Sequence, residues 1–253
     1  MKKIRKSRFA LIEILAVIAL LSVLISIFVP AFNRMMFGSK VDQMASNFKT
    51  GMEVAQAKAV ASRKYVAMIL PGNYVDADPK LKPYCNGGFR LAFVKREGDN
   101  WKFVSWVPGS NWSNIVDGAM LVNIQARKNW YEKENPDPNE PEDYEFKSLP
   151  ATNTDAKKSS FWNTVDDKRV SALIAITDST GDSDMSDLGH DENRSGIIFS
   201  PLGGSVNTVT PLLFFFTEAK INDSEFKYPN TDNFLVLKLN SLTGRVTHLA
   251  PED

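Results

Sequence analysis

The sequence predicts an α+β protein, with a long N-terminal helix packed on a mostly antiparallel β-sheet domain. Residues 9–32 form a nearly unbroken apolar run, which makes the first half of the helix a candidate transmembrane segment. Residues 33–64 continue it with apolar side chains at three- and four-residue steps, the pattern of an amphipathic helix. Short apolar runs with turn residues between them fill the body, residues 65–253, and strands that follow a helix in this way are typical of the α+β class.

The apolar run carries no charge between Glu13 and Arg34. About twenty apolar residues suffice to cross a bilayer as a helix, so the run is long enough to span. The leader, residues 1–8, contains five Lys or Arg residues and no acid. Cations beside an apolar span stay on the cytoplasmic side, which predicts one crossing and an extracytoplasmic body.

Glu13 lies near the start of this run, where a carboxylate without a partner is costly. The pattern Phe9-Ala-Leu-Ile-Glu13, followed by aliphatic residues and Pro30, resembles the N-terminus of type IV pilins and type II secretion pseudopilins. The resemblance implies that a prepilin peptidase cuts between Arg8 and Phe9 and that the new amine is methylated. It also implies that Glu13 pairs with the amine of a neighbouring subunit. Arg8 departs from the family pattern, which usually has Gly or another small residue before the cut.

The second half of the predicted helix should bury one face against the body. Strands are expected at residues 65–70, 119–124, 170–177, 196–200, 212–217, 234–239 and 245–249, and a hairpin at 89–95 and 101–107. The segment at about 129–160 is rich in proline and acid and predicts a mobile surface insertion. The apolar stripe of the helix comprises Val41, Met44, Ala45, Phe48, Met52, Ala55, Ala59 and Ser62.

Two motifs of the body resemble the H class of minor pseudopilins, which includes the FimT-like pilins. They are Phe199-Ser-Pro-Leu-Gly203 and Thr243-Gly-Arg-Val246. Their order relative to the N-terminal segment indicates a minor pseudopilin of this class.

One acidic loop is a candidate calcium site, because Asp178, Asp182, Asp184 and Asp187, with the Ser and Thr residues between them, place side-chain oxygens close together in sequence. The spacing is not that of an EF-hand, and a solvated acidic turn is the alternative. No other cofactor is expected. No nucleophile has a recognisable base or supporting motif, so the chain is not expected to be an enzyme.

These observations predict a structural subunit of a type II secretion or type IV pilus-like fibre, held in the bacterial inner membrane before assembly. The expected partners are other pilin or pseudopilin subunits, the prepilin peptidase, the membrane and secreted cargo. An alternative, favoured by Arg8, is an extracytoplasmic binding or enzymatic domain on an uncleaved anchor. Outside the leader there are 25 basic and 30 acidic residues, because five of the 30 basic residues lie in the leader. This acidic balance argues against a nucleic-acid partner.

Overall fold

The computed structural model describes residues 11–71, 79–126, 173–178, 193–206, 211–222, 225–228 and 233–249. The chain divides into two compact units, residues 1–39 and 40–253. Helix α1 (Leu11–Ser62) runs through the first unit and into the second. The side chains of residues 11–13, 27 and 29–38 lie outside the described part of the helix.

Within the second unit, α1 buries the stripe that its sequence spacing predicts. The seven apolar members of the stripe, from Val41 to Ala59, are at most 1% exposed. Phe48 is at the centre, and its ring centroid lies 5.3 Å from that of Phe214 and 5.4 Å from that of Phe216. Gly51 allows the third aromatic neighbour of Phe48, Phe89, to lie against the helix, because a side chain at Gly51 would collide with that ring.

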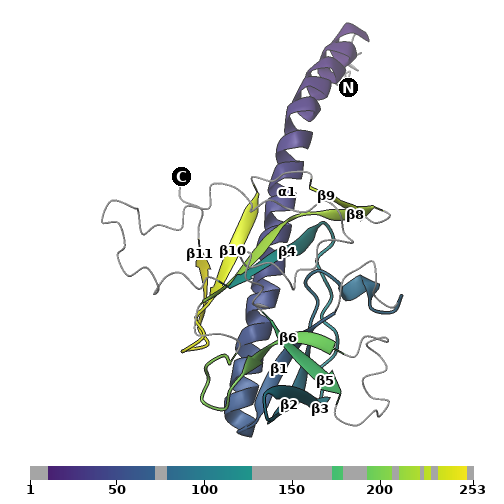
Figure 1. Ribbon diagram of the computed structural model, residues 1–253. Helices are drawn as coiled ribbons and strands as arrows, with labels where there is room; N and C mark the ends of the chain where they lie inside the picture. The colour runs from purple at the N-terminus through teal and green to yellow at the C-terminus, as the bar shows by residue number, and fades with distance from the viewer. Residues whose placement is uncertain are drawn as a thin grey trace, which may run out of the picture. The chain divides into compact units, whose positions relative to one another are not determined.

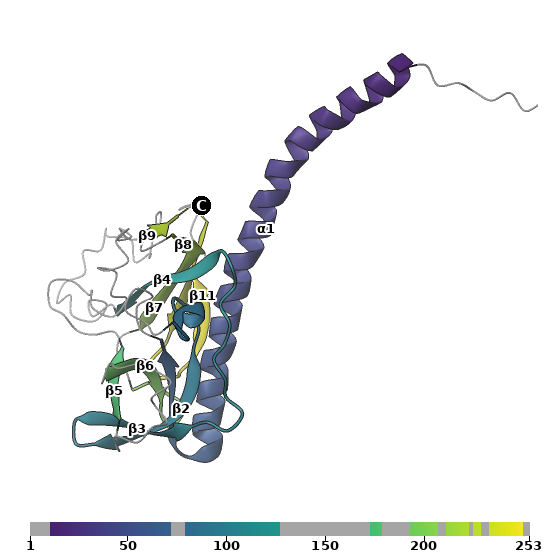
Figure 2. The same cartoon turned by 90° about the vertical axis from the view of Figure 1, so that its right-hand side faces the viewer.

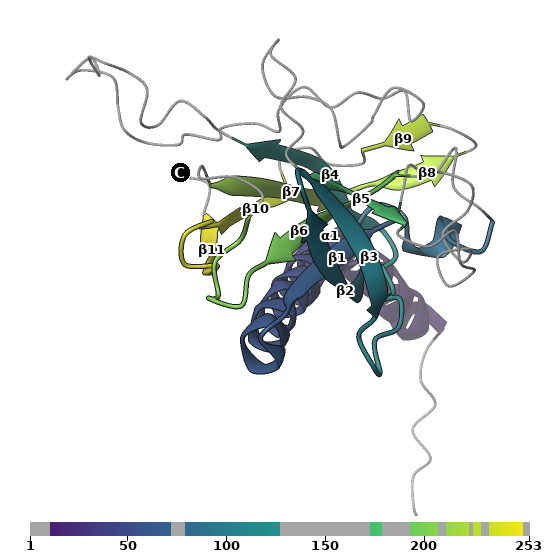
Figure 3. The same ribbon diagram turned by 60° about the horizontal axis from the view of Figure 1, so that its bottom comes forward.

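Five strands close into a barrel in the order β1-β2-β3-β5-β6 (Figures 1 and 3). All pairs are antiparallel except β3 with β5, and β1 pairs with both β2 and β6, which closes the barrel. Gly196 makes this closure possible, because a methyl group there would lie 2.9 Å from the Met68 carbonyl oxygen. The strands are β1 (Tyr65–Leu70), β2 (Arg90–Glu97), β3 (Asn100–Trp106), β5 (Ile174–Asp178) and β6 (Asn193–Phe199).

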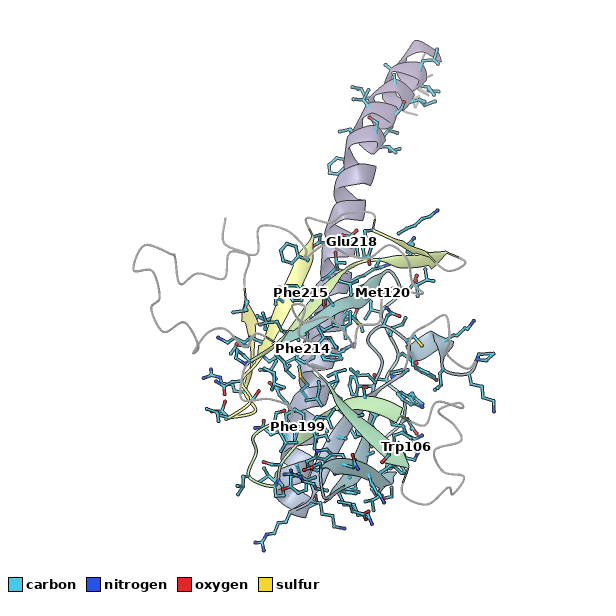
Figure 4. The ribbon with its side chains drawn as sticks, viewed as in Figure 1. Trp106, Met120, Phe199, Phe214, Phe215 and Glu218 are labelled. Atoms are coloured by element: carbon cyan, nitrogen blue, oxygen red, sulfur yellow. The ribbon has the colours of Figure 1, made fainter. Side chains whose placement is uncertain are left out.

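A second, antiparallel sheet has the order β11-β10-β7-β4, and Figure 2 shows it beside the packed half of α1. Every residue of β7 is buried. Phe214 joins the core cluster around α1, whereas Phe215 joins a separate cluster with Met120 and Val236 (Figure 4). The strands are β4 (Ala119–Ala126), β7 (Leu212–Glu218), β10 (Phe234–Leu239) and β11 (Val246–Leu249), and a two-stranded ribbon contains β8 (Lys220–Asn222) and β9 (Glu225–Lys227).

The predicted fold class is wrong in two respects. One mostly antiparallel sheet domain was expected, but the strands form a closed barrel and a separate four-stranded sheet. The transmembrane first half is also overturned, since no helix among the described residues is long and apolar enough to cross a membrane. That prediction depended on the length of the apolar run and on the cations of residues 1–8 beside it. The sheet prediction failed because strand patterns do not reveal which edges pair. The parallel pair β3 and β5 joins residues that lie 75 positions apart in sequence, such as Trp101 and Ile176.

Most individual strands were correctly predicted. The bounds of β1 and β10 match the expected residues, and β2 and β3 form the expected hairpin. The short strands β8 and β9 and the 3-10 helix η1 (Lys82–Tyr84) were not predicted. The insertion at about 129–160 lies outside the described residues.

Candidate functional site: an exposed apolar helix surface

In the first half of α1, the described residues 14–26 and 28 carry apolar side chains on all sides of the helix. The described large side chains from Ile14 to Phe28 are between 49% and 66% exposed, although they are aliphatic or aromatic. A helix that is apolar all round is normally covered by other protein or by lipid. We call the exposed apolar side chains of this half the apolar helix surface. Its members are Ile14, Leu15, Val17, Ile18, Leu20, Leu21, Val23, Leu24, Ile25 and Phe28.

Two serines interrupt this surface without adding free polar groups. The Ser22 hydroxyl donates to the Ile18 carbonyl oxygen at 2.6 Å, and the Ser26 hydroxyl donates to the Val23 carbonyl oxygen at 2.7 Å. Each hydroxyl is thus satisfied within the helix itself. The apolar helix surface can therefore be covered by an apolar partner without leaving these groups unpaired.

The residues of the predicted assembly site fall partly within the described chain. Glu13 and Pro30 are in helical backbone of α1, where their side chains are not described. Arg8 and Phe9 lie outside the described residues, so cleavage and methylation there stay predictions.

Most of the predicted calcium loop lies outside the described residues, so calcium binding there stays a prediction. Asp178 is the last residue of β5, in register with Phe103 of β3. Asp182, Asp184 and Asp187 lie outside the described residues. Among the residues that the structure does describe, no group of three or more His, Cys, Asp or Glu side chains is placed to hold a metal ion.

The two body motifs, which are separated by 39 residues in sequence, meet at one side chain of α1. The Gln56 amide nitrogen donates to the Gly203 carbonyl oxygen at 2.7 Å and to the Thr243 carbonyl oxygen at 2.8 Å. Gly244 has φ of +67° and lies so close to Gly203 that any side chain would collide with its carbonyl oxygen. In the sequence the two motifs are separate patterns. No feature of the sequence indicated that Gln56 donates hydrogen bonds to both of them.

A pocket of about 420 Å³ lies beside η1, large enough for a small molecule. The charged residues described in its wall are Lys82, Asp117 and Lys220. Cys85 also lines it, but its thiol is buried and donates to the Leu81 carbonyl oxygen at 3.4 Å. These residues do not pair a nucleophile with a base, so the pocket offers no recognisable reaction chemistry.

The turn between β2 and β3 concentrates charge, but its charges pair with one another. Glu97 accepts ion pairs from Lys95 and Lys102, both at 2.6 Å. Hydrogen bonds from Lys102 and then Lys95 lower the pKa of the Glu97 carboxyl to about 2. Arg96 lies 3.7 Å from Asp99. Each of these three cations therefore already has a carboxylate partner within the hairpin.

Comparison with known proteins gives one structural similarity. No family model matches the sequence, and no curated protein matches it. The structure is similar to the minor pseudopilin EpsH from the Type 2 Secretion System of Vibrio cholerae, with 11% sequence identity, over 85% of this chain and 98% of that one. The TM-score is 0.35, so this likeness by itself decides neither family nor function.

Proposed function

We propose that the chain is a structural subunit, of the minor pseudopilin kind, in a type II secretion or type IV pilus-like fibre. The single observation that carries the proposal is the apolar helix surface, which an isolated chain leaves in water. In a fibre, the helices of neighbouring subunits would cover it. Burial of apolar side chains contributes about 1.5–3 kcal/mol for each large residue, so a few such contacts suffice to hold subunits together.

Glu13 supplies specificity in this proposal. Among residues 9–33 it is the only charged side chain, so packed helices would surround it with apolar groups. A carboxylate in such surroundings needs a cation, and the amine of a neighbouring Phe9, exposed by cleavage after Arg8, would provide one. The prepilin peptidase would be the enzyme that acts on the chain, and the assembled fibre would lie in the cell envelope and contact secreted cargo.

The proposal is tested by replacing Glu13 in the full chain. Glu13→Leu should reduce incorporation into sheared fibres and secretion by tenfold or more, because one buried ion pair lost is worth about 1.4 kcal/mol or more. Mass spectrometry of the N-terminus shows first whether the chain begins at methylated Phe9. Both measurements are made in the secreting host strain.

Glu53→Leu is the matched control. Glu53 is a glutamate on the same helix, exposed to solvent and 4.0 Å from Lys49. A surface pair of this kind contributes little, so incorporation should stay close to wild type. Equal incorporation of the Glu13→Leu chain and wild type would remove the proposed role of Glu13 in assembly.

A further inference from the structure

The two turns that Gln56 joins expose leucines at the C-terminal end of α1. Leu202 is 96% exposed and Leu242 is 76% exposed, while Val60, one helical turn beyond Gln56, is 49% exposed. The turns lie against each other, because a methyl group on Gly204 would be 2.7 Å from the Leu242 carbonyl oxygen. Together with exposed Arg63 and Arg245, these residues form what we call the leucine surface.

Hydrogen bonds hold the backbone of the leucine surface. The Leu202 amide donates to the Ser200 hydroxyl at 3.3 Å, and the Ser205 amide donates to the Ser241 carbonyl oxygen at 2.7 Å. The Leu242 amide donates to the Asn240 side-chain oxygen at 3.1 Å. Two solvent-exposed leucines on turns that hydrogen bonds hold in place indicate a contact site.

The charge around these leucines has one sign. Residues 54–64, 200–206 and 240–248 contain four Lys or Arg residues and no acid. Among the described residues, neither Arg63 nor Arg245 forms an ion pair, unlike the cations of the β2–β3 hairpin. An apolar centre with a cationic rim fits a partner that carries apolar side chains between acids.

The chain itself contains a segment of that composition. Residues 131–146 hold seven acidic residues, one lysine and three aromatics, Tyr131, Tyr144 and Phe146. We propose that the leucine surface docks residues 131–146 of a second copy of this chain. The proposal rests on the fibre function above, which brings copies together, and it adds a contact made by the bodies.

Site-directed disulfide formation tests the docking. Two differently tagged full-length copies would be mixed, one carrying Leu242→Cys and the other Asn139→Cys, and then oxidised. We expect a cross-linked heterodimer whose yield falls severalfold between low salt and 0.5 M salt, because exposed charges are screened. The buried Cys85 is present in both copies, and unsubstituted chains measure its background.

Charge substitutions then test the recognition. Arg63→Gly should lower the yield about two- to fivefold, and it suits the backbone, because Arg63 has φ of +54°, where glycine is favoured. Leu202→Ser should lower the yield about tenfold, since an apolar contact is lost. Combining Arg245→Glu with Glu140→Lys in the other copy should restore the yield that Arg245→Glu removes.

Three results would overturn the docking. They are a yield insensitive to Arg63→Gly and Leu202→Ser, a disulfide that forms within a single chain when that chain carries both Leu242→Cys and Asn139→Cys, and cosedimentation with phosphatidylglycerol vesicles that the same substitutions abolish while no heterodimer forms. The last result would assign the leucine surface to an anionic membrane. Fibre incorporation of Glu13→Leu is scored separately, so failure of the docking leaves the helix-mediated assembly standing.

Discussion

The two halves of α1 use similar apolar residues in opposite ways. Val17 is 55% exposed, whereas Val41, in the same helix, is 1% exposed. The second half has a polar face opposite its apolar stripe and buries that stripe against β7, β2 and neighbouring elements. Among its described side chains the first half has no polar face, so a contact on one side could not bury it. The difference shows that a helical period of apolar residues predicts which face of a helix packs within its own chain. A helix that is apolar without such a period indicates a surface that several neighbours must cover.

Phe48→Ala should give the largest effect on the buried half. Phe48 is fully buried among three aromatic rings, and loss of such a side chain leaves a cavity that costs about 3–5 kcal/mol. Denaturant unfolding of the full chain measures the change in the free energy of unfolding. A change below about 1 kcal/mol would mean that the helix stripe is not part of the core.

Gln56→Ala should have an intermediate effect. The substitution deprives the Gly203 and Thr243 carbonyl oxygens of their donor, which costs about 1–2 kcal/mol in a half-buried site. Denaturant unfolding measures this loss of stability as well. Gln56→Glu is the sharper variant, because it keeps the shape but puts a carboxylate beside two carbonyl oxygens at pH 7. Its destabilisation should diminish as the pH falls and the carboxyl gains a proton it can donate. Wild-type stability in both variants would contradict the proposed joining of the turns.

Val17→Ser should have the smallest effect on the fold, within about 0.5 kcal/mol, because Val17 is exposed. Val41→Ser makes the same chemical change in the buried half and should cost about 2 kcal/mol. The pair therefore tests the comparison directly in one unfolding assay. Fibre incorporation should show the reverse sensitivity for Val17→Ser, falling while stability is kept. If both substitutions destabilise the chain equally, the first half is packed against the same molecule.

The strand positions and the buried stripe of α1 follow from local sequence. Short apolar runs bounded by turn residues mark β1 and β10, and three- and four-residue spacing marks the stripe from Val41 to Ala59. These features depend on which side of a local element is apolar, and neighbouring residues determine that. The motif from Phe9 to Glu13 is likewise recognised from the sequence alone. Cleavage and methylation at this motif stay predictions.

Only the tertiary structure decided how these elements combine. Closure of the barrel depends on β1 pairing at both edges and on the close approach at Gly196, and neither leaves a local pattern. The meeting of Gly203 with Gly244 under Gln56 joins residues more than 140 positions from the helix. Edge pairing and long-range hydrogen bonds depend on the geometry of distant segments, and therefore local composition could not predict them.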